Sequence, residues 1–324
     1  MRNFTLTTLT KITLILMVVV LVSACASYAP QQANGLQQTT AANKELVHTF
    51  YIAGGLGEMA DTSNNTLLNS LQATLNAANE NSTLLFTGDY TMEEPANKAT
   101  NKALLQEQIA MTEAFKGKTY FVPGANEWSS KNTDQIEWVE DYIKDNDLKG
   151  IEVEPNNVCP LEYRKISDDI DMILVDSNWY INNWDRVEGM NRKCTDITTQ
   201  RRFIEELEGM IKDARGKNLV IVMHHPIFSN GAYARNYMGG MNPDKIFFRR
   251  YQELAIKVSA LVLELDRVTI VSGHEESLQY LTAKNKVHQV ISGSLGSRSK
   301  TKRDKSRITA VGGHLEYEGQ YTHG

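Results

Sequence analysis

The sequence predicts a layered α/β fold with mixed β-sheets, and two observations lead to this prediction. Short apolar, β-branched or aromatic runs, typical of strands, are mostly followed by segments in which apolar residues recur at helical spacing. The last strand-like runs follow one another with no helix between them. No internal repeat is visible, and from about Lys44 the chain is long enough for one sizeable hydrophobic core.

The predicted elements follow in order along the chain. Residues 46–53 form the first strand, and a helix follows over 67–78, where leucines recur on one helical face. Further strands are expected at 83–87, 119–122, 172–176, 219–223, 269–272, 279–282 and 287–292. Further helices are expected at 104–115, 136–143, 204–211 and 254–265, since apolar residues recur there every three or four positions.

The first 24 residues have the composition of a secretion signal. Arg2 and Lys11 are positive, no acidic residue accompanies them, and an almost unbroken apolar run follows over 12–22. Such a run is too short to span a bilayer, which needs about 20 apolar residues. The small residues Ser23 and Ala24 then precede Cys25, as expected at a cleavage site.

The residues around Cys25 resemble the lipobox of bacterial lipoproteins, with Val22 where Leu is commoner. The resemblance implies that Cys25 is lipidated and anchors the protein in a membrane, since each buried methylene contributes about 0.8 kcal/mol. Ala26 after the anchor resembles lipoproteins sent to the outer membrane, so the expected location is the bacterial cell envelope. The alternative is an ordinary signal peptide followed by a chance cysteine.

Four segments are expected: the signal over 1–24, the lipidated cysteine with a flexible tether over 25–43, one domain over 44–310, and a tail over 311–324. The tether is rich in Ala, Gln, Thr and Asn and lacks apolar periodicity. A net charge of −5 gives no general reason to expect nucleic acid as a partner. The basic residues between Arg298 and Arg307 are expected to form a solvated loop.

With Cys25 committed to lipid, two cysteines remain. Outside the cytoplasm such a pair is usually oxidised, so we expect a disulfide between Cys159 and Cys194. Two separate buried thiols are the alternative. A bridge would stabilise the fold by roughly 3–4 kcal/mol in the chain-entropy description.

Small or polar residues follow five of the predicted strands directly. These clusters are Gly54-Gly55, Thr87-Gly88-Asp89, Pro123-Gly124-Ala125-Asn126-Glu127, His224-His225-Pro226 and Gly273-His274-Glu275-Glu276. In open α/β sheets the carboxyl ends of the strands and their loops form the ligand crevice, and glycine lets the backbone turn sharply there. Five such clusters in order predict a functional site.

The ordered motifs between about Val47 and Ser297 resemble the calcineurin-like metallophosphoesterases, in particular their purple-acid-phosphatase-like bacterial branch. The matching stretches are 85–89, 121–124 with Trp128, 222–231, 273–274 and 278–280, and the segments around Cys159, 175–179 and Cys194 also look similar. The resemblance implies a layered αββα sandwich of two mixed sheets flanked by helices. It also implies two metal ions a few ångströms apart, which bind phosphate and a hydroxide nucleophile.

Only three of the family's seven ligand positions keep their residue here, namely Asp89, His224 and His274. Gly55 stands where an Asp is expected, Met92 replaces a Tyr, Ala125 replaces an Asn and Glu276 replaces a His. The His that assists the leaving group falls on Asn126.

The remaining donors suit one divalent cation (Zn, Mn, Mg or Fe) rather than two. Glu276 is the candidate substitute ligand or base. Alternatively, His224 and His274 are relics held by hydrogen bonds. His225 is expected to point away from the metal. Asn126 and Glu127 are expected to stabilise loops, with Glu127 kept as an alternative replacement ligand.

Three functions compete. The favoured one is an envelope protein that is weakly active or non-catalytic and binds a phosphorylated small molecule or an envelope protein. The second is an active metal-dependent phosphomonoester hydrolase with a mononuclear or rebuilt metal site, and the third is a structural envelope domain. In this fold, specificity is expected in loops such as 179–192 and 229–245. A loose dinucleotide fingerprint starting at Gly55 is set aside, because the next predicted strand ends in Gly88-Asp89, too far on for the ribose-binding acid expected about 20 residues after the motif.

Overall fold

The structure is a computed structural model of the whole chain. It describes residues 31–32, 46–58, 66–93, 98–130, 132–182, 189–229, 231, 245–283, 287–293, 295–296 and 313–319. The expected signal, Cys25, most of the expected tether, the basic residues between Arg298 and Arg307 and most of the loop at 229–245 lie outside these residues.

One sheet has four strands, all parallel, in the order β2 (Thr49–Ala53), β3 (Ser82–Phe86), β4 (Lys118–Phe121) and β5 (Ile151–Val153). Three helices lie between these strands in the sequence: α2 (Thr66–Asn76), α3 (Lys98–Ala110) and α4 (Asp134–Asp145). Two short 3-10 turns, η1 (Leu56–Glu58) and η2 (Asn126–Trp128), follow β2 and β4.

The second sheet has eight strands in the order β1-β12-β10-β11-β9-β8-β7-β6. Their bounds are β1 Gln31–Gln32, β6 Leu161–Lys165, β7 Ile170–Val175, β8 Asn218–Met223, β9 Val268–Ser272, β10 Leu278–Ala283, β11 Val287–Ser292 and β12 Gly313–Gly319. The central strands β7, β8, β9 and β11 are parallel, and the outer ones are antiparallel. Helices α5 (Ser177–Ile181), α6 (Gln200–Asp213) and α8 (Lys245–Val262) belong to this half.

Alternation along the strands explains the layers. In β3, Leu84 and Phe86 pack in the core that includes α2, α3 and α4, whereas Leu85 lies in the core between the sheets. In β7, Ile173 packs with α5, α6 and α8, whereas Leu174 faces the other sheet. Side chains of a strand point to opposite faces in turn, so each sheet has two buried faces. Each such side chain contributes about 1.5–3 kcal/mol by burial.

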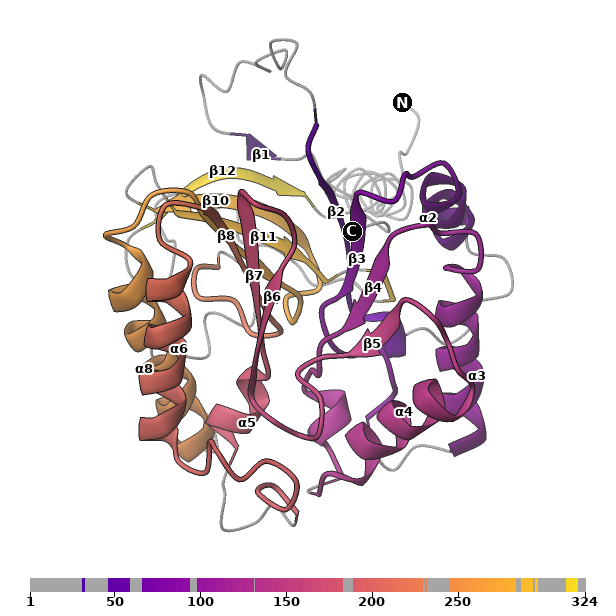
Figure 1. Cartoon of the computed structure of the whole chain (residues 1–324), viewed down its shortest axis with the longest axis horizontal. Helices are drawn as coiled ribbons and strands as arrows, with labels where there is room; N and C mark the ends of the chain where they lie inside the picture. Colours follow the sequence, from indigo (N-terminus) through magenta and orange to yellow (C-terminus); the bar gives the residue numbers. More distant parts are fainter. Residues whose placement is uncertain are drawn as a thin grey trace, which may run out of the picture. The chain divides into compact units, whose positions relative to one another are not determined.

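The predicted αββα sandwich is therefore confirmed, with helices covering the outer face of each sheet (Figure 1). One detail differs, since the four-stranded sheet is parallel throughout rather than mixed. The second sheet also includes β1 and β12, which lie outside the span 44–310 expected for the domain.

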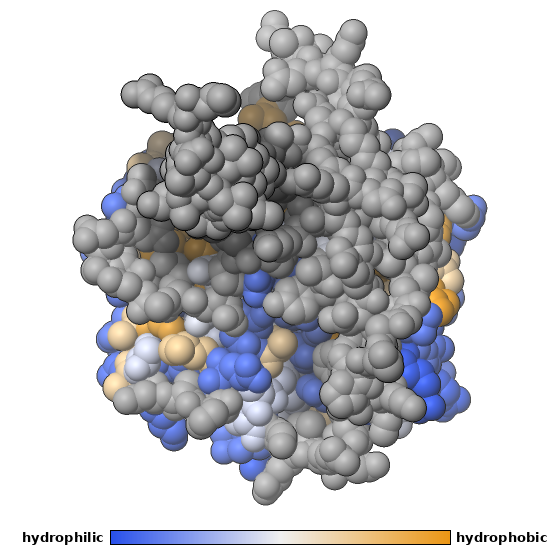
Figure 2. Space-filling model, turned by 180° about the vertical axis from the view of Figure 1, so that it is seen from behind, coloured by the Kyte–Doolittle hydropathy of each residue, from blue (hydrophilic) through white to orange (hydrophobic). Residues whose placement is uncertain are grey.

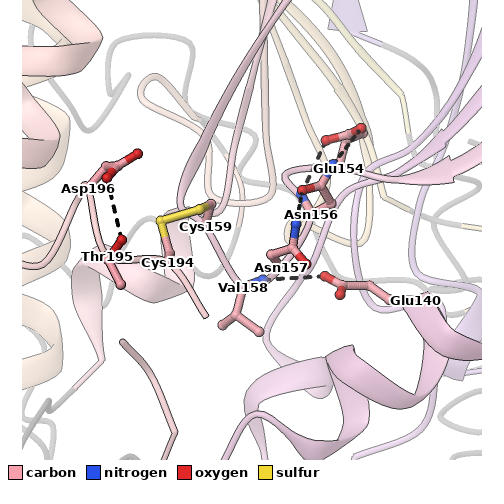
Figure 3. Close-up of a disulfide and its surroundings, with 9 residues drawn as sticks. All are labelled: Glu140, Glu154, Asn156, Asn157, Val158, Cys159, Cys194, Thr195 and Asp196. Carbon is pink, nitrogen blue, oxygen red and sulfur yellow. Dashed lines mark hydrogen bonds between the residues drawn. A yellow bond between two sulfur atoms is a disulfide. The ribbon is translucent and has the colours of Figure 1, made fainter. Parts of the chain in front are cut away.

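The predicted disulfide between Cys159 and Cys194 is present, with an S–S distance of 2.14 Å (Figure 3). Cys159 lies just before β6, and Cys194 lies in the segment that leads to α6. Both side chains pack against the core beneath α6 and α8. The bridge therefore ties an edge of the larger sheet to the helical layer that covers it.

The surface of the described residues is largely polar on the face seen from behind, with scattered hydrophobic residues (Figure 2). Leu46, Val47 and Ile256 are the large hydrophobic side chains that stand exposed among the described residues. Within the part of the chain that the structure describes, no helix has the length and apolar character needed to cross a bilayer.

Candidate functional site

The loops at the carboxyl ends of both sheets meet. The Gly55 N–H donates to the carbonyl oxygen of Gly88 at 3.2 Å, joining the loops after β2 and β3. In the other sheet, the Gly273 N–H donates to the carbonyl oxygen of His224 at 3.1 Å, joining the loops after β9 and β8. The hydroxyl of Ser292 at the end of β11 donates to the Ile52 carbonyl at 3.2 Å and so links the two sheets. The five clusters predicted from the sequence thus lie together at one edge.

Two glycines allow this close approach. A Cβ on Gly88, whose φ is +89°, would lie 2.3 Å from Nδ1 of His224. A Cβ on Gly124 would lie 2.4 Å from the nitrogen and 2.7 Å from Oδ1 of Asp89. Side chains at either position would displace the two polar residues at the centre of the site, so glycine is required there.

Asp89 is held in a left-handed conformation, with φ of +55°. Its N–H donates to Oε2 of Glu127 at 3.0 Å, and its Oδ1 accepts from the N–H of Asn126 at 2.8 Å. Oδ2 lies 3.3 Å from Nε2 of His224. Left-handed non-glycine residues cost about 1–3 kcal/mol and persist where surrounding contacts fix them. Here those contacts aim one carboxylate oxygen at His224.

Glu127 fastens the loops after β3 and β4. Its fully buried carboxylate accepts from the N–H groups of Asp89, Thr91 and Gly124 and from the Thr91 hydroxyl, at 2.7–3.0 Å. Burial, together with the nearby Asp89 carboxylate, raises the pKa of Glu127 to about 7. With four donors directed at it, this side chain stabilises loops, as expected from the sequence.

His224 is oriented by a backbone carbonyl. Its Nδ1 lies 2.8 Å from the carbonyl oxygen of Thr87, and because a carbonyl only accepts, Nδ1 carries the hydrogen. In the neutral imidazole Nε2 then presents its lone pair, and this buried nitrogen makes no hydrogen bond within the described part of the chain. It faces Oδ2 of Asp89 at 3.3 Å. A proton or a cation placed between Oδ2 of Asp89 and Nε2 of His224 would be bound by both atoms.

His224 also belongs to a group of three histidines that converge at this point. His224, His225 and His274 each offer one ligand nitrogen, and the three nitrogens lie within 4.8 Å of one another. Burial, and then the neighbouring imidazoles, lowers the pKa of His225 and of His274 well below the usual value. The neutral form, which is the form that binds metals, is favoured in both.

The expectation that His225 points away from this centre is wrong. β8 ends at Met223, and both His224 and His225 lie in a bend after it, so the alternation of side chains along a strand no longer applies. Nδ1 of His225 lies 2.8 Å from the buried Ser177 hydroxyl, and its ring packs edge-on against Tyr251 at 4.7 Å. Only the doubled histidine itself could have signalled this role.

The positions expected from the sequence to differ from the family pattern lie as follows. Gly55 has φ of +74°, and a Cβ there would lie 2.5 Å from the Gly293 carbonyl oxygen. The Met92 N–H donates to Asn101, and Ala125 precedes η2. The Asn126 amide donates to the Thr91 carbonyl at 2.9 Å.

Glu276 is half-buried and is not one of the three residues in the histidine group, so its role as a ligand or base stays a prediction. Its neighbour Glu275 is fully buried and accepts from the Ser229 hydroxyl at 2.8 Å.

Comparisons with known proteins agree with the geometry. The family model described as calcineurin-like phosphoesterase matches residues 56–277. No curated protein sequence matches the chain.

Among solved structures, the chain is similar to GAP50, described as the anchor in the inner membrane complex of Plasmodium. The TM-score is 0.56 and the identity 14%, over 85% of this chain and 78% of that one. It is similar to a dimetal phosphatase from Danio rerio, with a TM-score of 0.50 and 10% identity, over 85% of this chain and 97% of that one. For PhoD the TM-score is 0.51 and the identity 8%, over 85% of this chain and 62% of that one. At such identities these likenesses concern the fold.

Proposed function

The chain belongs to the calcineurin-like phosphoesterase family, and we propose that it is a lipid-anchored protein of the bacterial envelope that has lost efficient two-metal hydrolysis. In this proposal its domain binds a phosphorylated small molecule or an envelope protein through a centre with a single divalent cation.

The observation that carries the proposal is the conformation of Gly55. This glycine stands where the family's first carboxylate ligand is expected. Its positive φ and the Gly293 carbonyl, 2.5 Å from where a Cβ would lie, leave no room for any side chain. A two-cation centre would therefore lack one of its ligands, because the backbone at this position does not readily accommodate an Asp side chain.

Three further positions support the same conclusion. Ala125 has no donor atom in its side chain, and Met92 offers only a thioether, a poor ligand for the hard ions of two-metal centres. Asn126 stands where the leaving-group acid is expected, and its amide is engaged with Thr91. Loss of a general acid alone costs about 10²–10⁴-fold in rate.

The donors that remain fit one cation. His224 presents a buried Nε2 lone pair toward Asp89, and His274 lies beside it, with ring centroids 5.1 Å apart. A cation bound by these residues would offer an open coordination position to a phosphate or carboxylate oxygen. The chain's own groups would fix that position, since the Thr87 carbonyl and the loops fastened by Glu127 hold the ligands in place.

A binding function also has a precedent in this fold. GAP50, one of the similar structures, is described as an anchor in a membrane complex. Its likeness to this chain supports only the idea that the fold can serve in attachment.

The deciding experiment measures metal content and hydrolysis together. The full-length protein, purified from membranes in detergent, is analysed for metals by mass spectrometry and assayed with an aryl phosphate across several pH values and added metals. We expect about one divalent ion per chain and turnover far below that of a two-metal enzyme. Two ions per chain with rapid turnover that His274→Ala abolishes would overturn the proposal.

The anchor has its own test. We expect the wild-type protein to partition into the detergent phase and to carry alkyl chains on Cys25, detectable by mass spectrometry of the N-terminal peptide. The variant Cys25→Ala should lose both properties. A wild-type protein cleaved at another site and free of lipid would contradict the lipoprotein assignment.

A second candidate is an active phosphoesterase with one cation. The close approach of Asp89 and His224 favours it, because a cation held there would still polarise a phosphate oxygen. Slow, metal-dependent turnover that disappears in Asp89→Asn, with only one ion per chain, would select this candidate over the binding protein. A third candidate, a structural envelope domain, predicts neither metal nor stabilisation by phosphate.

A further inference from the structure

We propose that His225 supplies a further ligand, so that His224, His225 and His274 form a tri-imidazole centre for a transition ion such as Zn²⁺. The inference rests on the proposed function, because it names the ion and the ligands of the same single-cation centre. His225 stands outside the set of ligands that the family pattern supplies.

The arrangement of the rings supports convergence. Ring centroids lie 4.4 Å apart for His225 and His274, 4.9 Å for His224 and His225, and 5.1 Å for His224 and His274. The rings are inclined by 46°, 89° and 72° in these three pairs rather than stacked in parallel. Inclined rings can turn three edges toward one point, as the ligands of a tetrahedral ion must.

Partners on the far side of two rings set which nitrogen coordinates. The Thr87 carbonyl holds Nδ1 of His224, and the Ser177 hydroxyl holds Nδ1 of His225. In this proposal Nε2 coordinates in both rings, and Nδ1 of His225 donates to the Ser177 oxygen. Metal-binding histidines in proteins are oriented in this way by a hydrogen bond to the other ring nitrogen.

Ser177 is itself fixed. It is the first residue of α5, follows the capping residue Asp176, and accepts from the His225 N–H at 3.2 Å. Ser177 is thus a positioning residue for His225.

The donor set also selects the ion. Mg²⁺ and Ca²⁺ prefer oxygen ligands, whereas imidazole suits Zn, Cu, Fe and Ni. A set of three imidazoles is known to bind Zn²⁺. His224 and His225 are fully buried, so a bound ion would be shielded from bulk water on that side.

The test is metal binding rather than activity. Metal-free full-length protein in detergent is titrated with Zn²⁺, Co²⁺ and Mg²⁺, and the Co²⁺ absorption spectrum reports coordination geometry. We expect one Zn²⁺ or Co²⁺ per chain, an intense tetrahedral-type Co²⁺ spectrum, and no comparable Mg²⁺ binding. His225→Ala should weaken Zn²⁺ binding by more than the roughly 10–100-fold that loss of a ligand's hydrogen-bond partner costs.

A milder variant guards against misfolding. Ser177→Ala removes only the hydroxyl and should weaken Zn²⁺ binding by about 10–100-fold while changing the Co²⁺ spectrum. His288→Ala is the matched control, because His288 bonds Tyr280 on the β10–β11 pair and is not one of the three clustered histidines. It should bind Zn²⁺ like the wild type. Thermal melting of each metal-free variant shows whether it is folded.

The outcomes separate the two proposals. If one ion binds and depends on His224 and His274 but not on His225 or Ser177, the tri-imidazole centre is overturned and the single-cation function stands. If two ions bind per chain, the proposed function fails and this inference fails with it. Tight Mg²⁺ binding at the same centre would also overturn the assignment of the ion.

Discussion

Gly55 has a backbone conformation that limits which side chains its position at the site can carry. Its φ of +74° is favoured only for glycine, and the Gly293 carbonyl occupies the space that a side chain would need. Gly293 belongs to the other sheet's last loop, so the obstruction comes from a residue distant in sequence. Placing a carboxylate ligand here therefore requires more than one substitution.

Gly55→Asp is expected to destabilise the protein without adding a bound metal. The left-handed backbone and the contact with Gly293 should lower the free energy of unfolding by about 1–3 kcal/mol, measured by urea denaturation. Gly209→Asp is the control, because Gly209 lies in α6 with nothing within 4 Å of an added Cβ. That change should stay within about 0.5 kcal/mol. A stable Gly55→Asp protein with a second metal would refute this account.

For single residues, the sequence could predict which side chains belong to the site but not how those side chains are oriented. Asp89, His224 and His274 follow strands in an ordered pattern, and the structure brings Asp89 within 3.3 Å of His224. His225 could not be assigned, because the bend after Met223 turns it by an amount that residue identity does not specify. The partner of His225, Ser177, lies 48 positions away, a separation that no local pattern encodes.

The elements that were predicted are those with long periodic patterns. α4, α6 and most central strands lie where apolar spacing placed them. α3 begins at Lys98, before the expected start at 104, because its first turn is polar and its apolar positions mark a face rather than an end.

Short or polar elements were missed. β5 has three residues, and β6, an edge strand, carries the charged residues Glu162, Arg164 and Lys165. Charges on an edge discourage pairing with other chains, and they also hide the strand from a hydrophobicity pattern.

The disulfide permits a prediction about the connection between elements. Replacing Cys159 and Cys194 together by serine should lower the free energy of unfolding by roughly 3–4 kcal/mol, because a closed loop of 35 residues is released in the unfolded chain. Urea denaturation of this variant should match that of the wild type under a reductant. An unchanged denaturation midpoint would show that the bridge contributes little.

Across the whole molecule, buried carboxyl groups should make stability depend on pH in an unusual direction. Burial raises the pKa of Asp176, Glu140 and Glu154 to about 7 in each case. Between their ordinary values, near 4, and 7 the unfolded chain binds fewer protons than the native protein. The stability they contribute is complete below that range and is lost as the pH rises toward 7.

Glu137 acts in the opposite sense at lower pH. Although burial opposes the change, hydrogen bonds from Thr133, Lys193 and Arg192 hold the pKa of Glu137 at about 2. Its contribution is present above pH 4.5, its ordinary value, and is lost as the pH falls toward 2. The free energy of unfolding, measured by urea denaturation across this range, should therefore be greatest on the acidic side of neutrality.

The variant Asp176→Asn tests whether buried carboxyl groups cause this loss of stability toward pH 7. Asn keeps an oxygen that can accept from the Trp179 N–H at the start of α5, as Asp176 does at 3.0 Å, but it does not titrate. The fall in stability between pH 4 and 7 should become shallower in this variant. A slope identical to that of the wild type would assign the effect to other groups.

The hydrogen bond from His224 to the Thr87 carbonyl has one more consequence. It joins the loop after β8 to the loop after β3. The imidazole therefore links the two sheets whether or not an ion is bound. Selection for a stable fold can therefore preserve this histidine long after turnover has ceased. Surveys that infer enzyme activity from the presence of this histidine alone will therefore count inactive members of the family as active enzymes.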